Sequence, residues 1–308
     1  MNRDVTIVLY HHISERESGL TNQLGLSTKP NVFEKHIKYF SKNYDFVSPR
    51  DLLEGHLPRK SLIVTFDDAY RSVLDIACPT LRAVGAPSLF FVNPTTLMSD
   101  VVPIDNILSY VLDQLGLDAV LSLLDVPAGQ VTSIAQLFGK IVSQMNNANV
   151  HAAKLRLLSA IGTEEGALRQ SSQLFLEQKD IESLLKYDVE IGNHSMSHIF
   201  FRSLSPDELK EEICVSRAIL KRLTSKPIHY LSIPYGNEID ATSEVLEIAR
   251  GCGHRAIFLA HAKSNMFWRQ QDVYFRISMG NSSPEMLGLK LRLMPVLRSI
   301  RDVVRVWN

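Results

Sequence analysis

Short apolar runs alternate along the chain with segments whose apolar residues recur at helical spacing. The runs consist mainly of Val, Ile, Leu and Phe, which is typical of buried strands. A strand, a helix and a further strand, repeated in this way, predict a mainly parallel sheet with right-handed crossovers, either open or closed into a barrel. The predicted strands cover residues 5–10, 61–66, 87–92, 189–192, 228–233, 256–260 and 273–278.

The alternation stops between Asn93 and about Gln178, where the pattern predicts no strand. Residues 104–124 and 134–162 instead carry apolar positions at helical spacing. We therefore expect one domain, residues 1–308, with a helical insertion at about 93–178. The insertion is a candidate lid or dimer surface, and an elaboration that only adds packing is the alternative.

Two helix starts carry recognisable signals. Ser205, followed by Pro206 and by Glu208 three residues on, predicts a capping box, and Ser283 before Pro284 is a similar start. The second signal begins a basic amphipathic segment, about 284–307. Such a helix could lie on an anionic membrane surface, or it could be the last helix that covers the barrel.

Composition narrows the class of protein. The chain has 308 residues, of which 45% are hydrophobic and 21% charged, as in a soluble globular protein of the size of an α/β barrel. Lys+Arg and Asp+Glu number 33 each, so the overall charge does not indicate a nucleic-acid partner. The N-terminal apolar run is too short for a signal peptide, and no stretch approaches the ~20 apolar residues of a membrane span.

Cysteine usage points to the compartment. Cys78, Cys214 and Cys252 are far apart in the sequence and form no CxxC pair. An odd number of widely spaced cysteines predicts reduced thiols rather than a disulfide framework. We therefore expect a cytoplasmic protein.

Two adjacent carboxylates follow the strand predicted at residues 61–66. Neighbouring side chains on a strand point to opposite faces, so Asp67 and Asp68 can share a site only if the strand ends at Phe66 and the backbone turns. Polar groups at the carboxyl ends of parallel strands are where α/β folds build their sites. The alternative is an ordinary turn or helix N-cap, where Asp is a favoured residue.

A second polar cluster, "EIGNHSMSH", follows the strand predicted at 189–192. His194 and His198 have the spacing of one helical turn, so both imidazoles can face one metal ion. Two His and one carboxylate form a common catalytic zinc set. One Asp of the pair would then bind the metal, and the other would accept a proton from water held by it.

Two further strand ends carry polar groups. The turn in "YLSIPYG" can direct the backbone N–H of Tyr235 into the site as an oxyanion donor, although Pro-x-Gly is also an ordinary turn. The first strand ends in His11 and His12, of which alternation allows only one to face inward. A single His at a strand end is more often structural than catalytic.

Taken together, these motifs resemble those of a known family. "TFDDAY", "HSMSH" and "IPYG", in this order on strand ends, are similar to the first three motifs of the polysaccharide deacetylases (NodB-homology, carbohydrate esterase family 4), and "LYHHIS" is similar to the opening of many members. The resemblance covers roughly residues 1–92 and 175–285. It implies an α/β fold, a distorted (β/α)7 barrel, and a metal-dependent amide hydrolase that usually removes acetyl from an N-acetylated sugar.

The resemblance also implies roles for individual residues. Asp67 would be the general base, Asp68, His194 and His198 the ligands of a divalent metal, and Tyr235 the oxyanion donor. Zinc is the expected metal, with nickel or cobalt as alternatives.

The sequence departs from the family pattern at several points. The third motif of the family usually has an Arg a few residues before the Tyr, where this chain has Ser232 and Ile233. The stretch "LSIPYG" is similar to the Arg-less "FAYPYG" branch, and the fourth and fifth motifs are absent. The fifth motif supplies the usual general acid, so this role falls to His11 as first candidate or to His261 as second. Arg276, in the late strand "VYFRIS", is a candidate to orient Asp67.

The sequence therefore predicts a metal-dependent deacetylase of an N-acetylated sugar in cell-surface glycan synthesis. A polysaccharide, a lipid-linked glycan or a nucleotide sugar would suit a cytoplasmic enzyme, in the last two cases with peripheral contact at the inner membrane face. An oligomer is compatible with the sequence. The alternatives are a hydrolase of another amide, such as a formamide or cyclic amide, and a non-catalytic glycan-binding relative.

Overall fold

Parallel strands form the centre of the molecule. The structure, a computed structural model, describes residues 4–263, 265 and 272–293. Each barrel strand pairs in parallel with the strands that precede and follow it in the chain, as expected for repeated strand–helix units. The strands are β1 (Asp4–Tyr10), β5 (Lys60–Phe66), β6 (Ser88–Val92), β7 (Val189–Asn193), β8 (Tyr230–Ser232), β9 (Ala256–Leu259), β10 (Val273–Phe275) and β11 (Ile277–Ser278).

One segment, residues 273–278, closes the ring. Its first part, β10, pairs with β9, and its second part, β11, pairs with β1. Arg276 lies between the two parts, and its N–H donates to the carbonyl of Leu259. With β10 and β11 counted as one strand, the described chain forms a ring of seven parallel strands, as predicted for a distorted (β/α)7 barrel.

The predicted strands agree with the observed ones within two residues at either end. Three short strands were not predicted, because two-residue pairings leave no hydrophobic period in the sequence. They are β2 (His12–Ile13), which pairs with β3 (Ser27–Thr28), and β4 (Asp45–Phe46), which pairs with β5.

Side chains of alternate strand residues fill the barrel interior. Ile7, Ile63, Phe91, Phe258 and Tyr274 belong to one buried cluster inside the ring. Because side chains on a strand alternate between its two faces, the next inward-facing side chain lies two residues further along, toward the carboxyl end of the strand. The interior alternation therefore continues from Tyr274 to Arg276, and from Ile63 through Thr65 to Asp67.

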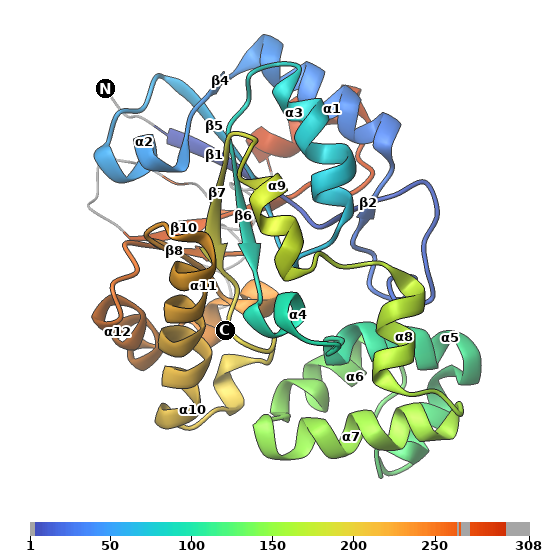
Figure 1. Ribbon diagram of the computed structural model, residues 1–308. Coiled ribbons are helices and arrows are strands. Elements are labelled where there is room, and N and C mark those ends of the chain that lie inside the picture. The colour runs from blue at the N-terminus through green and yellow to red at the C-terminus, as the bar shows by residue number, and fades with distance from the viewer. Residues whose placement is uncertain (1–3, 264, 266–271, 294–308) are drawn as a thin grey trace, which may run out of the picture.

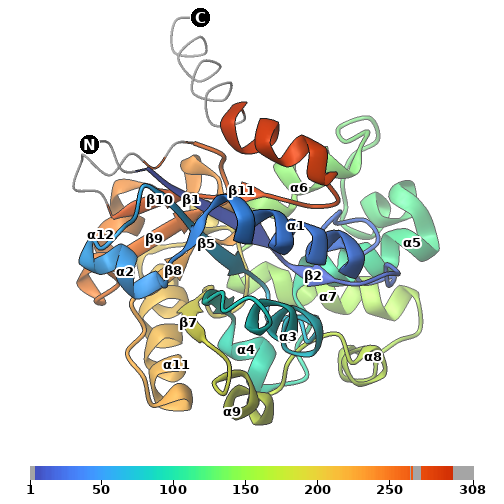
Figure 2. The same ribbon diagram turned by 90° about the horizontal axis from the view of Figure 1, so that it is seen from above.

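Helices surround the barrel (Figure 2). The predicted capping box is present at Ser205, whose Oγ accepts the N–H of Glu208 while the Glu208 carboxylate accepts the N–H of Ser205. Apart from the helices within residues 104–172 and the C-terminal helix that begins at Pro284, the helical elements of the described residues are α1 (Pro30–Asn43), α2 (Pro49–Glu54), η1 (Val73–Ala77), α3 (Cys78–Arg82), α4 (Pro94–Met98), η3 (Gln178–Asp180), α9 (Ile181–Leu184), η4 (Phe201–Ser203), α10 (Pro206–Lys210), η5 (Glu211–Val215), α11 (Ser216–Thr224), η6 (Pro234–Gly236), η7 (Glu238–Asp240) and α12 (Ser243–Gly251).

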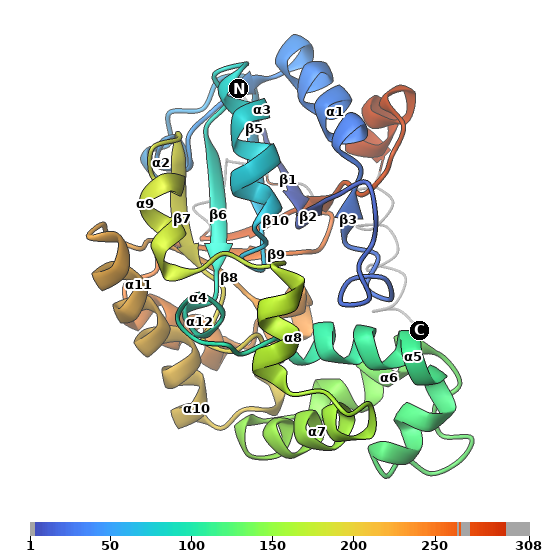
Figure 3. The same cartoon turned by 45° about the vertical axis from the view of Figure 1, so that its right-hand side comes forward.

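Helices of the segment between β6 and β7 gather beyond the carboxyl end of β6 (Figures 1 and 3). Their apolar faces form a separate core, which also includes Tyr70, Phe175 and Phe200. Tyr70 stacks on Phe175 with the ring centroids 5.3 Å apart, so this core is joined to the "TFDDAY" segment. The elements are α5 (Ile104–Leu123), α6 (Ile134–Lys140), η2 (Val142–Gln144), α7 (Asn147–Ala160) and α8 (Glu165–Ser172).

The predicted C-terminal helix begins at Pro284 and is described as far as residue 293. Leu287 and Leu291 are buried in the core outside the barrel strands, so this part covers the barrel. The rest of the segment predicted at 284–307 lies outside the described residues. Among the helices that the structure describes, none combines the length and the apolar character needed to cross a membrane.

Cys214 and Cys252 form a disulfide, so the expectation of reduced thiols is wrong for this pair. The two residues are 38 apart in sequence, and the packing of α12 against η5 brings their Cα atoms within 5.4 Å. Cys78 is buried and remains a free thiol. The odd count therefore arises from one pair and one core cysteine, which sequence spacing alone does not distinguish.

Loss of this disulfide is expected to destabilise the protein. The double variant Cys214→Ser/Cys252→Ser should lower the free energy of unfolding by about 3–4 kcal/mol, because the open loop gains conformational entropy in the unfolded chain. Urea unfolding without reductant measures the change, and Cys78→Ala is the control for loss of a thiol outside the pair. Three reactive thiols in the unfolded, unreduced protein would contradict the pairing.

Candidate active site

Asp67 and Asp68 enter the site from the end of β5. The strand ends at Phe66, as a shared site requires, and the backbone then turns through positive φ angles of 74° at Asp68 and 55° at Ala69. These values lie in the left-handed region, which is unfavourable for residues other than glycine. The turn is held in place because the carbonyl of Ala69 accepts the N–H of Leu176 at 2.8 Å. Both carboxylates are buried.

His194 and His198 converge, but through a loop instead of a helical turn. Ser195 and His198 have φ angles of 67° and 59°, which no helix contains. The loop is fixed by Glu212, whose carboxylate accepts the N–H groups of the two residues before His198 at 2.9 and 3.0 Å. Glu212 is only 1% exposed. Sequence reasoning missed it, since it lies on η5 and no local pattern links it to the His pair.

The two imidazoles present their Nε2 atoms to the same oxygen. Oδ1 of Asp68 lies 3.0 Å from Nε2 of His194 and 3.2 Å from Nε2 of His198, yet neither contact is aligned as a hydrogen bond, and this buried oxygen makes no other. On the far side of the ring, Nδ1 of His194 must donate to the carbonyl of Ser232, 2.9 Å away. Nε2 is therefore the nitrogen of His194 that faces the carboxylate of Asp68.

This arrangement fits a divalent metal ion. One ligand atom from each of Asp68, His194 and His198 lies within 4.8 Å of the other two, and all three residues are buried. A carboxylate oxygen without a hydrogen bond, facing two imidazole nitrogens, is the donor set that zinc prefers. These three residues would hold the metal.

Asp105, from the first turn of α5, faces the other nitrogen of His198. Its Oδ2 lies 3.4 Å from Nδ1 of His198, and the carboxylate is 4% exposed. Burial lowers the pKa of His198, but Asp105 and Asp68 outweigh it and raise that pKa well above its usual value. A positive charge is therefore favoured at this position, whether as a proton on the ring or as a bound cation. No sequence pattern pointed to Asp105, because its position depends on how the insertion packs.

Neutralising Asp105 is expected to weaken metal binding. A carboxylate behind a ligating His orients the ring and raises its basicity, and loss of such a partner typically costs 10–100-fold in metal affinity. Asp105→Asn should therefore lower zinc affinity by about 10–100-fold, measured by competition with a chromophoric chelator. Asp113→Asn, at an exposed position further along α5, is the matched control. Equal zinc affinities in the two variants would contradict this assignment.

Asp67 stands apart from the ligand set and is held by Arg276. Nη1 and Nη2 of Arg276 donate to the two Asp67 oxygens at 2.7 and 2.8 Å, and Oγ of Ser232 bridges the pair. Burial raises the pKa of Asp67, but Arg276 and His194 outweigh it and hold the pKa below its usual value. Asp67 is therefore ionised at neutral pH. The sequence-based candidate Arg276 thus occupies the position beside Asp67, and Ser232 in "LSIPYG" contacts both groups.

Tyr235 lies on the turn between β8 and α12. Its backbone φ angle is 60°. Its ring stacks on the ring of Phe200 with the centroids 3.6 Å apart, and its centroid lies 4.8 Å from that of the His198 ring. The following Gly236 is required, because a Cβ there would lie 2.1 Å from the backbone nitrogen of Ala260. The "IPYG" turn therefore places Tyr235 in the wall of the site.

Of the paired histidines at the end of β1, His11 faces the site and His12 does not. Nε2 of His11 lies 3.9 Å from Oδ2 of Asp68, whereas Nδ1 of His12 contacts Oγ of Ser27 at 2.9 Å. Burial lowers the pKa of His11, although the nearby carboxylates act in the opposite sense. The second candidate acid, His261, faces Glu238 at 3.3 Å and is not among the described residues that line the pocket.

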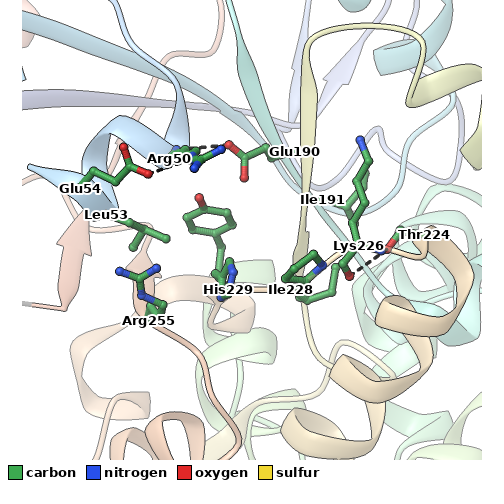
Figure 4. A pocket seen from close by; sticks show the side chains of 12 residues that line it. Arg50, Leu53, Glu54, Glu190, Ile191, Thr224, Lys226, Ile228, His229 and Arg255 are labelled. Atoms are coloured by element: carbon green, nitrogen blue, oxygen red, sulfur yellow. Dashed lines mark hydrogen bonds and ion pairs between the residues drawn. The ribbon is translucent and has the colours of Figure 1, made fainter. Parts of the chain in front are cut away.

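These groups share a pocket of about 530 Å³ at the carboxyl ends of the strands. A second cavity, of about 390 Å³, lies at the opposite, amino ends of β7 and β8 (Figure 4). Glu190 in that cavity accepts the backbone N–H of Arg50, and Lys226 and Arg255 lie along its rim. None of the predicted catalytic or metal-binding residues lines it, and this end of a barrel usually serves stability.

Comparison with known proteins agrees with this site. A family profile described as polysaccharide deacetylase matches residues 54–257, which is more than half of the chain. The chain belongs to the polysaccharide deacetylase family. No curated protein sequence matches it significantly.

Solved deacetylase structures share the fold. The Streptococcus pyogenes deacetylase PplD, in complex with acetate, superposes with a TM-score of 0.62 at 16% identity, over 95% of this chain and 100% of that chain. IcaB from Ammonifex degensii gives 0.58 at 20% identity, over 95% and 97% of the two chains. BC0361, a polysaccharide deacetylase from Bacillus cereus, gives 0.60 at 13% identity, over 94% and 70%. The predicted barrel of the polysaccharide deacetylase type is thereby confirmed.

Proposed function

We propose that the chain is a metal-dependent carbohydrate N-deacetylase, which hydrolyses the amide of an N-acetylated amino sugar to acetate and the free amine. The observation that carries the proposal is the division of labour between the two adjacent carboxylates. Asp68 faces His194 and His198, whereas Asp67 is kept ionised by Arg276 and belongs to no ligand set. Membership of the polysaccharide deacetylase family supports the same chemistry.

The residues of the chain would act in sequence on the substrate amide and a water molecule. Asp67 accepts a proton from the attacking water, and the backbone N–H of Tyr235 donates to the oxyanion that develops on the amide carbonyl. The departing amine receives a proton from His11, the acid candidate that lines the pocket. A divalent metal, zinc in our proposal, would act as a Lewis acid that polarises the carbonyl and lowers the pKa of water.

Acetate release from a substrate panel tests the proposal. N-acetylglucosamine oligomers are compared with small formamides and cyclic amides, before and after chelation and on addition of zinc. We expect acetate from the N-acetylated sugars only, lost on chelation and restored by zinc. Activity confined to formamides or cyclic amides would show that the enzyme hydrolyses another class of amide. Sugar binding without release of any product would indicate a non-catalytic relative.

A further inference from the structure

The pocket has a polar floor and an apolar rim. The carboxylates and imidazoles at its floor, Asp67, Asp68, His194 and His198, are at most 5% exposed. Most of the half-buried or exposed side chains around this floor are apolar, namely Leu24, Leu26, Ile134, Ala135 and Phe138, and they lie beside the polar side chains of Gln23 and Ser278. A substrate amide that reaches the floor therefore leaves the rest of its molecule against an aliphatic and aromatic surface.

The rim face of α6 is set by helical geometry. Ile134 and Phe138 are four residues apart and lie on one side of the helix, directed into the pocket. Leu137, on another side, is fully buried in the core of the insertion. Ile134 and Phe138 also pack against the edge of that core, and both side chains line the pocket as well.

The opposite wall is fixed by the same insertion. Asn106 donates to the carbonyl of Leu20 at 2.8 Å, and Oγ of Ser109 donates to the carbonyl of Gly19 at 2.7 Å and accepts the N–H of Gln23 at 3.1 Å. These hydrogen bonds attach the loop that contains Leu24 to helix α5. Both apolar walls thus depend on the helical insertion, which the rest of the mechanism uses only for Asp105.

We propose that this rim, defined by Leu24, Leu26, Ile134, Ala135 and Phe138, is a subsite for an apolar aglycone on the amino sugar. The substrate class is then an amphiphilic glycoside, in which a hydrocarbon group is linked to the N-acetylated sugar, rather than an internal unit of a water-soluble polysaccharide. Leucine and isoleucine side chains offer no hydrogen bond to sugar hydroxyls, whereas they gain from covering hydrocarbon. The inference rests on the proposed deacetylase function.

The position of the rim favours the aglycone over the acyl group. The carbonyl under attack must lie at the floor, beside Asp67 and Tyr235, and an acetyl methyl group extends only one carbon further. The sugar and its substituents extend outward to the half-buried rim. A deep apolar pocket for a long acyl chain would be lined by buried side chains instead, and Ala135 in the rim is exposed.

A series of alkyl glycosides of N-acetylglucosamine tests the subsite, at concentrations below micelle formation. A fully buried methylene contributes about fourfold in binding and a half-covered one about twofold, so the octyl glycoside should exceed the methyl glycoside in kcat/KM by roughly a hundredfold. N-acyl glucosamines of increasing chain length form the second arm. A gain along this second series instead of the first would overturn the assignment to the aglycone.

Variants on α6 locate the effect. Phe138→Ser, or the milder Ile134→Ala if the former folds poorly, should reduce the octyl-to-methyl ratio at least fivefold. Leu155→Ser, at an exposed position of α7 outside the pocket, should leave the ratio unchanged. A chain-length gain that survives both rim variants would show that the hydrocarbon binds elsewhere. Equal kcat/KM for methyl and octyl glycosides would overturn the subsite while leaving the deacetylase proposal intact.

Calorimetry with octyl and methyl glycosides of glucosamine keeps the test independent of turnover. Wild-type protein should bind the octyl compound at least tenfold more tightly, and Phe138→Ser should remove most of this difference. If no glycoside is hydrolysed but this binding difference is present, the deacetylase proposal fails and the apolar subsite stands. If the two glycosides bind equally, the subsite fails whatever the turnover.

Discussion

Replacement of Asp67 by asparagine is expected to lower kcat about a thousandfold while metal content stays at the wild-type level. Of the two adjacent carboxylates, only Asp67 forms an ion pair with Arg276, and this contact keeps Asp67 ionised. An amide cannot accept the proton of the attacking water, so loss of the base should appear in kcat rather than in metal binding. Steady-state kinetics on an N-acetylated sugar, with metal analysis of the same samples, measures both.

The control for this prediction is an acidic residue outside the site. Asp75→Asn, at an exposed position on η1, should retain kcat and metal content. A kcat for Asp67→Asn within tenfold of wild type would show that another group accepts the proton. Loss of metal in this variant would instead show that Asp67 belongs to the ligand set.

Replacement of Arg276 by leucine is expected to lower the free energy of unfolding by about 3–5 kcal/mol and to abolish turnover. The Arg276 side chain is fully buried, and its removal leaves the Asp67 carboxylate buried without a compensating charge. Burial would then raise the pKa of Asp67 and disfavour the ionised base that the reaction needs. Urea unfolding measures the first effect, and acetate release measures the second.

Arg250→Leu is the matched control for Arg276→Leu. Arg250 also pairs with an aspartate, Asp272, at 2.5 Å, but both side chains are substantially exposed. Exposed pairs contribute about 1 kcal/mol or less, so Arg250→Leu should change stability little. Similar losses of stability in the two variants would show that the Arg276 pair is no more important than a surface ion pair.

The parts of the site that could be predicted from sequence are those attached to strand ends. Asp67, Asp68, His194 and Tyr235 each follow a recognisable apolar run, and parallel strands bring their carboxyl ends to one edge of the barrel. Alternation predicted that only one of His11 and His12 faces inward, and His11 occupies that position. Arg276 could be proposed because a charged residue inside an apolar strand requires a partner.

The rest depends on tertiary packing that no local pattern records. Asp105 approaches His198 only because α5 is anchored by Asn106, which donates to Leu20 and to Tyr70. Glu212 shapes the histidine loop from an element that follows it in the chain. The Cys214 disulfide likewise arises from contact between η5 and α12, since the 38-residue separation conceals it in the sequence.

Metal content of the purified protein, beside that of His194→Ala/His198→Ala, tests the central claim most directly when acetate release is assayed on the same samples. We expect about one divalent ion per chain in the wild-type protein, and loss of both the ion and acetate release in the variant. Wild-type protein that takes up no zinc, or a double variant that retains its metal and releases acetate at the wild-type rate, would contradict the account.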